Sequence, residues 1–156
     1  MKKVRVDSFC VIGKLGSTIQ DPKIVKKLWV EADMHFLEIK SLAKKHENGG
    51  LKALWGIMSR DDMSFMPWQD NYSKGLYLAG VEVDDDAVPS EGWVKWRVPG
   101  FIGYKVKVEG NDTFINTIKW LRDNNLELAM AVQDYTDPQT QENYMLFPIE
   151  KFNIYE

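Results

Sequence analysis

The chain reads as one supersecondary unit written twice. Each half is predicted to give a strand, a helix and two further strands in that order, over residues 4–84 and 93–149. The echo is clearest between LKALWGIMSRDD from Leu51 and LELAMAVQDYTD from Leu126, which both follow a predicted helix and end in polar residues. Each half is too small to bury a good core alone, so we expect the two to share one. Ligand clefts tend to lie where such units meet.

The apolar periodicity and the turn residues set the expected elements. The expected strands are residues 5–15, 51–59, 76–84, 93–98, 101–108, 126–135 and 143–149. One expected helix opens at Asp21-Pro22 and ends at Gly49-Gly50, and the other runs between Asn111-Asp112 and Asn124-Asn125. Two such units predict a single α+β domain over residues 1–156. We expect one largely antiparallel sheet, or two joined at the seam, with both helices on one side and a central cleft.

Composition narrows the class of protein. The 156 residues carry a net charge of -3 and no strongly basic segment, which argues against direct nucleic-acid binding. The single cysteine, Cys10, allows no internal disulfide and suits a reducing compartment. No signal-peptide stretch and no apolar run of membrane-spanning length is present, so we expect a cytoplasmic protein without membrane contact. The sequence holds no phosphate-binding glycine loop, CxxC or HExxH motif, and we predict neither a metal nor a cofactor.

Aromatic residues are the main candidate for a binding surface. The chain has six Trp, six Tyr and seven Phe, and several of them fall on faces predicted to point inward. The prominent ones are Trp29, Trp55, Trp68, Trp96 and Tyr104. Each ring alone is explained by core packing, but Trp and Tyr also carry a polar atom that needs a partner. The loop of residues 60–74 adds further large apolar side chains that must pack against something.

Two acids accompany these rings. Alternation along residues 126–135 places Asp134 at the end of an apolar face, and Glu82 interrupts the apolar strand LYLAGVEV. A buried carboxylate is costly unless it is compensated, and a cationic ligand supplies both charge compensation and cation–π contacts. The alternatives are a solvent-facing strand residue for Glu82 and a turn-starting acid for Asp134, which precedes Thr136 and Pro138.

Three segments together resemble the GyrI-like, or AraC-type, effector-binding domain. They are GLYLAGVEVDDDAVPSEGWVKWRVPGFIGYKV, the helix with INTIKWL, and VQDYTDPQTQENYMLFPI, and the front half agrees through FCVIGKLGS and KKLWVEADMHF. The resemblance implies a duplicated strand-helix-strand-strand fold with a central cleft for lipophilic, often cationic, small molecules. It also implies that relatives serve drug-sensing regulators, inhibit DNA gyrase, or hydrolyse reactive cyclopropane compounds.

One position departs from the family pattern. The family often has a glutamate two residues before an aromatic in the penultimate strand, and Gln133 stands there, before Tyr135. Asp134 is adjacent and is expected to take over the charge; without a charge a neutral ligand is the alternative. The predicted ligand-binding residues are Trp29, Phe36, Trp55, Trp68, Glu82, Trp96, Tyr104, Gln133, Asp134 and Tyr144.

Three functions follow from these features. The leading prediction is a stand-alone binding module for an amphipathic, cationic small molecule, with a regulatory or protective role. A hydrolase is the second, with Asp134 or Glu82 as general base and Tyr104 or Tyr144 as proton donor. The third is a module that binds a protein partner, such as gyrase, a separate DNA-binding protein or a second copy. For that role residues 63–72 would form the contact if exposed; folded over the cleft, they would be a lid instead.

Overall fold

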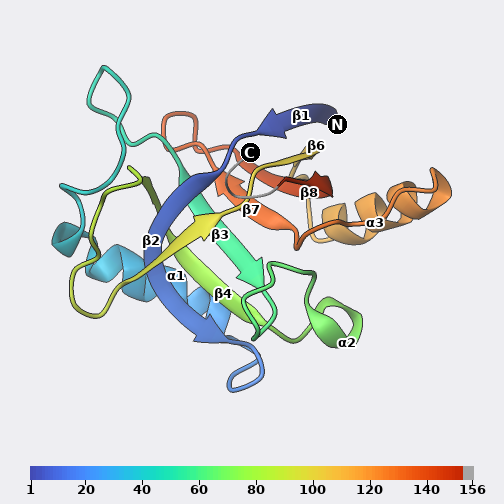
Figure 1. Ribbon diagram of the computed structural model, residues 1–156, viewed down its shortest axis with the longest axis horizontal. Helices are drawn as coiled ribbons and strands as arrows, with labels where there is room; N and C mark the ends of the chain where they lie inside the picture. Colours follow the sequence, from blue (N-terminus) through green and yellow to red (C-terminus); the bar gives the residue numbers. More distant parts are fainter. Residues whose placement is uncertain (153–156) are drawn as a thin grey trace.

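The computed structural model describes residues 1–152 and shows one sheet with helices packed on it (Figure 1). The strands are β1 (Lys2–Val6), β2 (Phe9–Ser17), β3 (Leu54–Ser59), β4 (Leu76–Val83), β5 (Val94–Val98), β6 (Phe101–Lys107), β7 (Gln133–Thr136) and β8 (Asn143–Lys151). The helices are α1 (Ile24–Met34), α2 (Gln69–Tyr72), α3 (Thr113–Asp123) and the short 3-10 helix η1 (Phe36–Glu38). The predicted α+β class is confirmed.

The strand order shows how the two repeated units join. All eight strands form one antiparallel sheet in the order β1-β6-β8-β7-β3-β4-β2-β5. Strands β2, β4 and β3 of the first unit adjoin one another, as do β6, β8 and β7 of the second. The units meet where β3 pairs with β7. Each unit also contributes an edge strand to the other, because β1 pairs with β6 and β5 pairs with β2.

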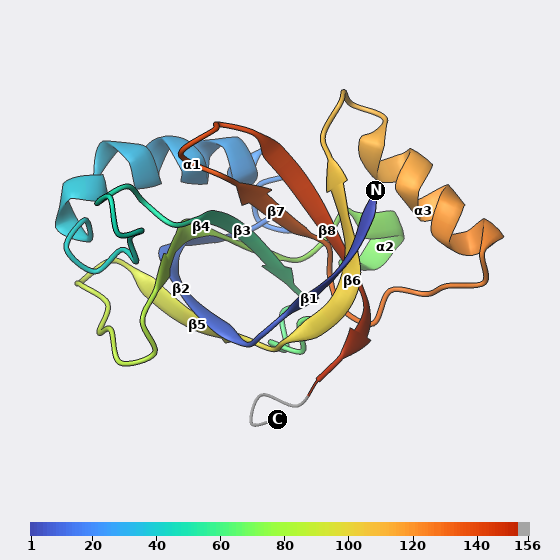
Figure 2. The same ribbon diagram turned by 90° about the horizontal axis from the view of Figure 1, so that it is seen from above.

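The two long helices cover the same side of this sheet (Figure 2). Helix α1 packs on β2 and β4, where Leu28 contacts Tyr77 and Ala79. Helix α3 packs through Ile118 and Leu121 against the sheet of the second unit, near Val132 and Phe147. The seam between β3 and β7 therefore lies between the two helices.

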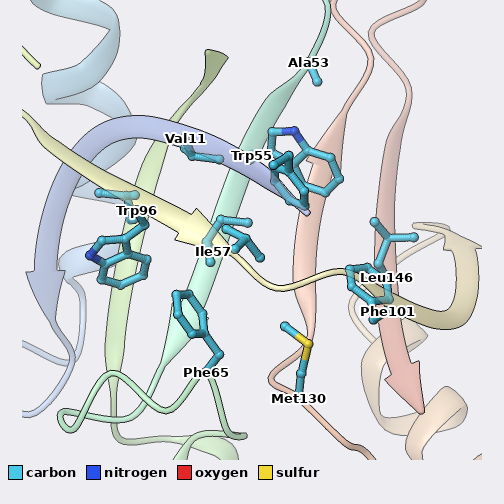
Figure 3. Close-up of a cluster of buried hydrophobic side chains, with 12 residues drawn as sticks. Val11, Ala53, Trp55, Ile57, Phe65, Trp96, Phe101, Met130 and Leu146 are labelled. Atoms are coloured by element: carbon cyan, nitrogen blue, oxygen red, sulfur yellow. The ribbon is translucent and has the colours of Figure 1, made fainter. Parts of the chain in front are cut away.

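The other side of the sheet curves around a dense aromatic core (Figure 3). Trp55, Ile57 and Trp96 point into it from three different positions on the sheet, and all three are buried. Phe65 reaches this core from the loop after β3 and meets the Trp96 ring edge-on at 5.7 Å between centroids. This side of the sheet is filled by the protein's own side chains.

The first helix is shorter than its sequence pattern predicts. Helix α1 ends at Met34, so the helix predicted to continue to Gly49-Gly50 is wrong in its second half. At the end of β4 that β3 does not reach, the segment after η1 pairs with β4 instead. Ala43 forms a bridge with Val83, and the backbone amide of Lys44 donates to the backbone carbonyl of Glu82. This pairing across the sheet outweighs the local helical periodicity.

The strands at residues 126–135 and 5–15 also differ from prediction. Only residues 133–136 form strand β7, because the amide of Ala131 bonds to the carbonyl of Phe65 instead of to β8. The predicted first strand is split into β1 and β2, and Ser8 at the break donates to the carbonyl of Val98. Within residues 1–152, no helix has the length and apolarity that crossing a membrane requires.

Candidate functional site

Three side chains connected by two hydrogen bonds lie on the helix side of the seam. The indole N–H of Trp29 on α1 donates to the Tyr77 hydroxyl at 3.0 Å, and that hydroxyl donates to the Asp134 carboxylate at 2.7 Å. Strand β3 separates the strands that carry Tyr77 and Asp134. These hydrogen bonds therefore connect helix α1 and both repeated units to the Asp134 carboxylate.

Gly56 makes this contact possible. It is the residue of β3 paired with Asp134 across the seam, and the Tyr77 hydroxyl lies directly over it. A Cβ atom on Gly56 would fall far inside the van der Waals distance of the Tyr77 hydroxyl and ring carbon. A side chain at this position would push the phenol off the carboxylate, so the absence of one is a requirement of the site.

The carboxylate has no cationic partner among residues 1–152. None of the ion pairs in this part of the chain includes Asp134. Burial raises the pKa of the Asp134 carboxyl, and the hydrogen bond from Tyr77 opposes part of that rise. Burial and the nearby acid raise the pKa of Tyr77 well above its usual range, so the phenol stays a neutral donor. No cluster of His, Cys, Asp and Glu within residues 1–152 is placed to hold a metal ion.

Asp134 lines an apolar hollow of about 200 Å³, here named the Asp134 hollow. Its walls come from β3, β7, β8, α3 and the loop before β4. They are Met58, Pro67, Trp68, Tyr72, Phe114, Ala131, Val132, Asp134 and Met145. Rings and methionines thus surround a single acid, an arrangement suited to a lipophilic group that carries positive charge.

The loop of residues 60–75 covers this hollow. The Trp68 indole donates to the carbonyl of Leu76, and the Tyr72 ring meets Phe114 of α3 at 5.3 Å between centroids. The larger open groove on the outer side of the loop, about 1260 Å³, shares Trp68 and Tyr72 with the Asp134 hollow but does not reach Asp134. The loop therefore lies between this groove and the Asp134 hollow.

Parts of this loop hold a costly backbone conformation. Asp70, Asn71 and Tyr72 follow one another with φ of 54°, 56° and 61°, and Met63 and Phe65 also have positive φ. Left-handed backbone costs non-glycine residues roughly 1–2 kcal/mol each, although asparagine tolerates it better. The loop holds its place beside the hollow against this local cost.

A second hollow lies on the same side of the sheet, on the first unit. It measures about 140 Å³ and is named here the Trp93 hollow. Its walls are Trp29, Ala32, Asp33, Phe36, Ile39, Leu51, Leu54, Gly80, Val81 and Trp93. Four of the ten predicted ligand-binding residues therefore line these two hollows: Trp29 and Phe36 line the Trp93 hollow, and Trp68 and Asp134 line the Asp134 hollow.

The other predicted acid has a different environment. Glu82 is on the opposite face of the sheet, where its carboxylate accepts the Trp55 indole N–H at 3.0 Å. The ammonium groups of Lys44 and Lys52 lie 3.7 and 3.9 Å from it. The Glu82 charge is therefore already paired, whereas the Asp134 carboxylate has no cationic partner among residues 1–152.

The remaining predicted residues lie away from both hollows. Trp55 and Trp96 belong to the core of the opposite face. Gln133 is fully buried, and its amide has no hydrogen-bond partner among residues 1–152. Tyr104 packs against Trp120 of α3, and Tyr144 bonds to the Glu142 carboxylate. For Gln133 the physical reason is alternation, because the residues on either side of Asp134 along β7 project to the opposite face.

The sequence prediction missed several residues that complete the site. Tyr77 is the most important of them, and Met58, Tyr72, Phe114 and Met145 line the Asp134 hollow. A signal for Tyr77 exists, because its alternation with Ala79 and Val81 along β4 marks a buried phenol that needs a partner. The partner itself depends on strand order, which the local pattern does not contain.

The sequence matches no protein-family model and no curated protein. The likenesses are structural. The chain superposes on EcmrR in a complex with DNA with a TM-score of 0.65 at 12% identity, over 97% of this chain and 57% of that one. It superposes on the EcmrR C-terminal domain with a TM-score of 0.59 at 13% identity, over 97% of each chain.

Two further structures have the same architecture. SAV2435 bound to tetraphenylphosphonium gives a TM-score of 0.59 at 10% identity, over 96% of this chain and 93% of that one. An integron cassette protein from the mobile metagenome of Vibrio cholerae gives 0.53 at 14% identity, over 97% and 95%. The chain therefore has the fold of the EcmrR C-terminal domain, as its resemblance to GyrI-like effector-binding domains predicts.

Proposed function

We propose that this protein binds a lipophilic cation in the Asp134 hollow. The observation that carries the proposal is a carboxylate in an apolar, ring-lined hollow with a phenol as its hydrogen-bond donor and no cationic side chain beside it. An unpaired charge in such a place destabilises the empty protein. A bound cation removes that cost, while a neutral or anionic ligand does not.

The surrounding rings favour the same class of ligand. Trp68, Tyr72 and Phe114 line the hollow with Asp134, and each aromatic face in contact with a cation contributes about 0.5–2 kcal/mol. The methionines Met58 and Met145 supply adaptable apolar surface. The ligand class is therefore a cation whose charge is shielded by apolar groups.

The position of the loop favours small-molecule binding over a protein-contact role. Residues 63–72 would serve a protein partner if they exposed a continuous apolar patch. Instead Phe65 is buried in the core, and Trp68 and Tyr72 form a wall of the Asp134 hollow. This placement supports the lid alternative over the protein-contact alternative.

Tryptophan fluorescence tests the proposal directly, since Trp68 lines the hollow and Trp29 bonds to Tyr77. The probe is tetraphenylphosphonium, chosen because SAV2435, which has the same fold, is seen bound to it. We expect saturable quenching at tens of micromolar or below, which corresponds to about 6 kcal/mol of binding free energy. Triphenylphosphine oxide, which has similar rings but no net charge, should bind far more weakly. Equal quenching by both compounds, or none by the cation, would refute the proposal.

The hydrolase alternative gains no support from the arrangement of its proposed groups. Neither Tyr104 nor Tyr144 is hydrogen-bonded to Asp134 or Glu82. The phenol that does contact Asp134 is that of Tyr77. Its raised pKa and its buried position keep it protonated, so it serves as a hydrogen-bond donor to Asp134.

A further inference from the structure

The Trp93 hollow has apolar walls on both of its sides. On the sheet, Leu54 of β3 and Val81 of β4 line it, and on the opposite side Ala32 of α1 and the segment after this helix cover it. Val81 and Ala32 are buried, whereas Leu54 and the covering Phe36 keep part of their surface exposed. The hollow is therefore a pocket between helix and sheet whose inner end is apolar.

The polar atoms of its two indole rings are already bonded elsewhere. The N–H of Trp93 donates to the Glu38 carboxylate at 2.9 Å. The N–H of Trp29 donates to the Tyr77 hydroxyl at 3.0 Å. Both rings thus present carbon surface to the hollow. A trapped water molecule needs about two to four polar partners, and the walls formed by residues 1–152 offer few, so an apolar occupant suits the hollow better than water.

The charges near the hollow do not favour a cation. Asp33 is the one charged residue that residues 1–152 contribute to its walls, and it is exposed. An exposed carboxylate attracts a ligand cation only weakly. The ammonium of Lys14 lies 4.3 Å from the centroid of the Trp93 ring, so a second cation on that ring would meet a like charge. The Asp134 hollow differs, because its carboxylate is buried without a cationic partner among the described residues.

The volume of the hollow limits its occupant to about one ring. It measures about 140 Å³, and an apolar cavity of about 150 Å³ in another protein binds benzene. We infer that the Trp93 hollow is a second binding site, which takes a neutral, apolar molecule of one aromatic ring. It goes beyond the cation site proposed above and does not depend on it. The two hollows on the helix side of the sheet then select different ligands, one a cation and the other a neutral ring.

Toluene and N-methylpyridinium test this inference, because they share one shape and differ by one positive charge. NMR titration of the nitrogen-labelled protein follows the backbone amides of Ala32 and Val81, which belong to the walls. Toluene should shift both amides saturably, with a Kd at or below about 1 mM. N-methylpyridinium should bind there at least about tenfold more weakly. No saturable shift with toluene, or equal shifts with both compounds, would overturn the inference.

A matched pair of substitutions assigns each ligand to its hollow. Ala32 lines the Trp93 hollow and Ala131 lines the Asp134 hollow, so the same change to leucine narrows one hollow at a time. Ala32→Leu should weaken toluene by about tenfold or more and leave tetraphenylphosphonium within about twofold of the wild type. Ala131→Leu should weaken tetraphenylphosphonium and leave toluene unchanged.

The outcomes also separate this site from the proposed function. If Ala131→Leu removes toluene binding and Ala32→Leu does not, the ring binds in the Asp134 hollow and the second site is wrong. An equal loss of toluene in both variants contradicts the second site as well. If the wild type binds toluene as expected but not tetraphenylphosphonium, the cation proposal fails and the second site stands. Should Ala32→Leu not fold, Leu51→Phe narrows the same hollow from outside the helix and must give the same loss of toluene.

Discussion

Tyr77 on β4 donates its hydroxyl to the carboxylate of Asp134 on β7 at 2.7 Å, and the bond passes over Gly56 of the intervening strand. One hydrogen bond thus links the first repeated unit to the second beside the Asp134 hollow. It stabilises an acid that has no cationic partner within residues 1–152 and fixes the position of its carboxylate.

Gly56→Ala should destabilise the protein strongly. The new methyl group would collide with the Tyr77 ring and hydroxyl, and overpacking of this kind costs about 1–3 kcal/mol, with the loss of the hydrogen bond added to it. Urea unfolding measures the change in the free energy of unfolding. Gly50→Ala is the control, because its Cβ would meet only the ends of the Asn48 and Gln139 side chains. Similar stability losses in both variants would contradict the close packing at Gly56.

Tyr77→Phe should lower the free energy of unfolding by about 1–3 kcal/mol. The change leaves Asp134 without its donor and the Trp29 indole without its acceptor. It should also raise the pKa of Asp134 further, because the bond from Tyr77 lowers that pKa. The control is Tyr135→Phe, on the other face of the sheet, where no side-chain hydrogen bond contributes to the pKa of the phenol. If the control is as damaging as Tyr77→Phe, the hydrogen-bond chain is not the cause.

Cation binding should strengthen as pH rises. Burial raises the pKa of Asp134 in the folded protein, so the carboxyl keeps its proton to a higher pH than in an unfolded chain. A cation binds the ionised form, and affinity should therefore increase up to about tenfold per pH unit until the pH passes that pKa. Calorimetry with tetraphenylphosphonium between pH 4 and pH 8 checks this. Asp134→Asn should flatten the profile, and a wild-type affinity that rises on acidification would have the wrong sign.

Gln133→Met should leave the protein as stable as before, or stabilise it by about 1–3 kcal/mol. The buried Gln133 amide has no partner for its nitrogen or its oxygen within residues 1–152, and an apolar side chain of similar shape avoids that desolvation cost. Thermal unfolding measures the shift, with the exposed Gln139→Met as control. A large loss of stability in Gln133→Met alone would mean that the amide is satisfied in solution.

The sheet and its repeated units were open to prediction because their signals are local. Nearly continuous apolar runs mark β4 and β8, and Pro99-Gly100 marks the break between β5 and β6. The ends of α1 and β7 were not predictable in this way. They depend on the bridge from Ala43 to Val83 and the bond from Ala131 to Phe65, which join residues distant in sequence.

The candidate site was likewise predictable only where its signal is local in the sequence. Alternation within β7 correctly separates Asp134 from its neighbour Gln133, although the apolar face before Val132 is irregular. The pairing of Asp134 with Tyr77 was missed, because it requires the strand order β4-β3-β7 and a glycine between the two side chains. Trp55 and Trp96 were predicted as ligand residues because a strand pattern shows which residues are inward but not which side of the sheet carries the two hollows.

The most direct test compares two acids on opposite faces of the sheet. Tetraphenylphosphonium affinity is measured by calorimetry in the wild type, Asp134→Asn and Glu82→Gln at pH 7.5. Each variant removes one negative charge and keeps the shape of the side chain. The account predicts that Asp134→Asn loses about 10- to 100-fold in affinity while Glu82→Gln, whose carboxylate faces Lys44 and Lys52, stays within about twofold of the wild type. Unchanged binding in Asp134→Asn, or an equal loss in both variants, would contradict the assignment of the cation site.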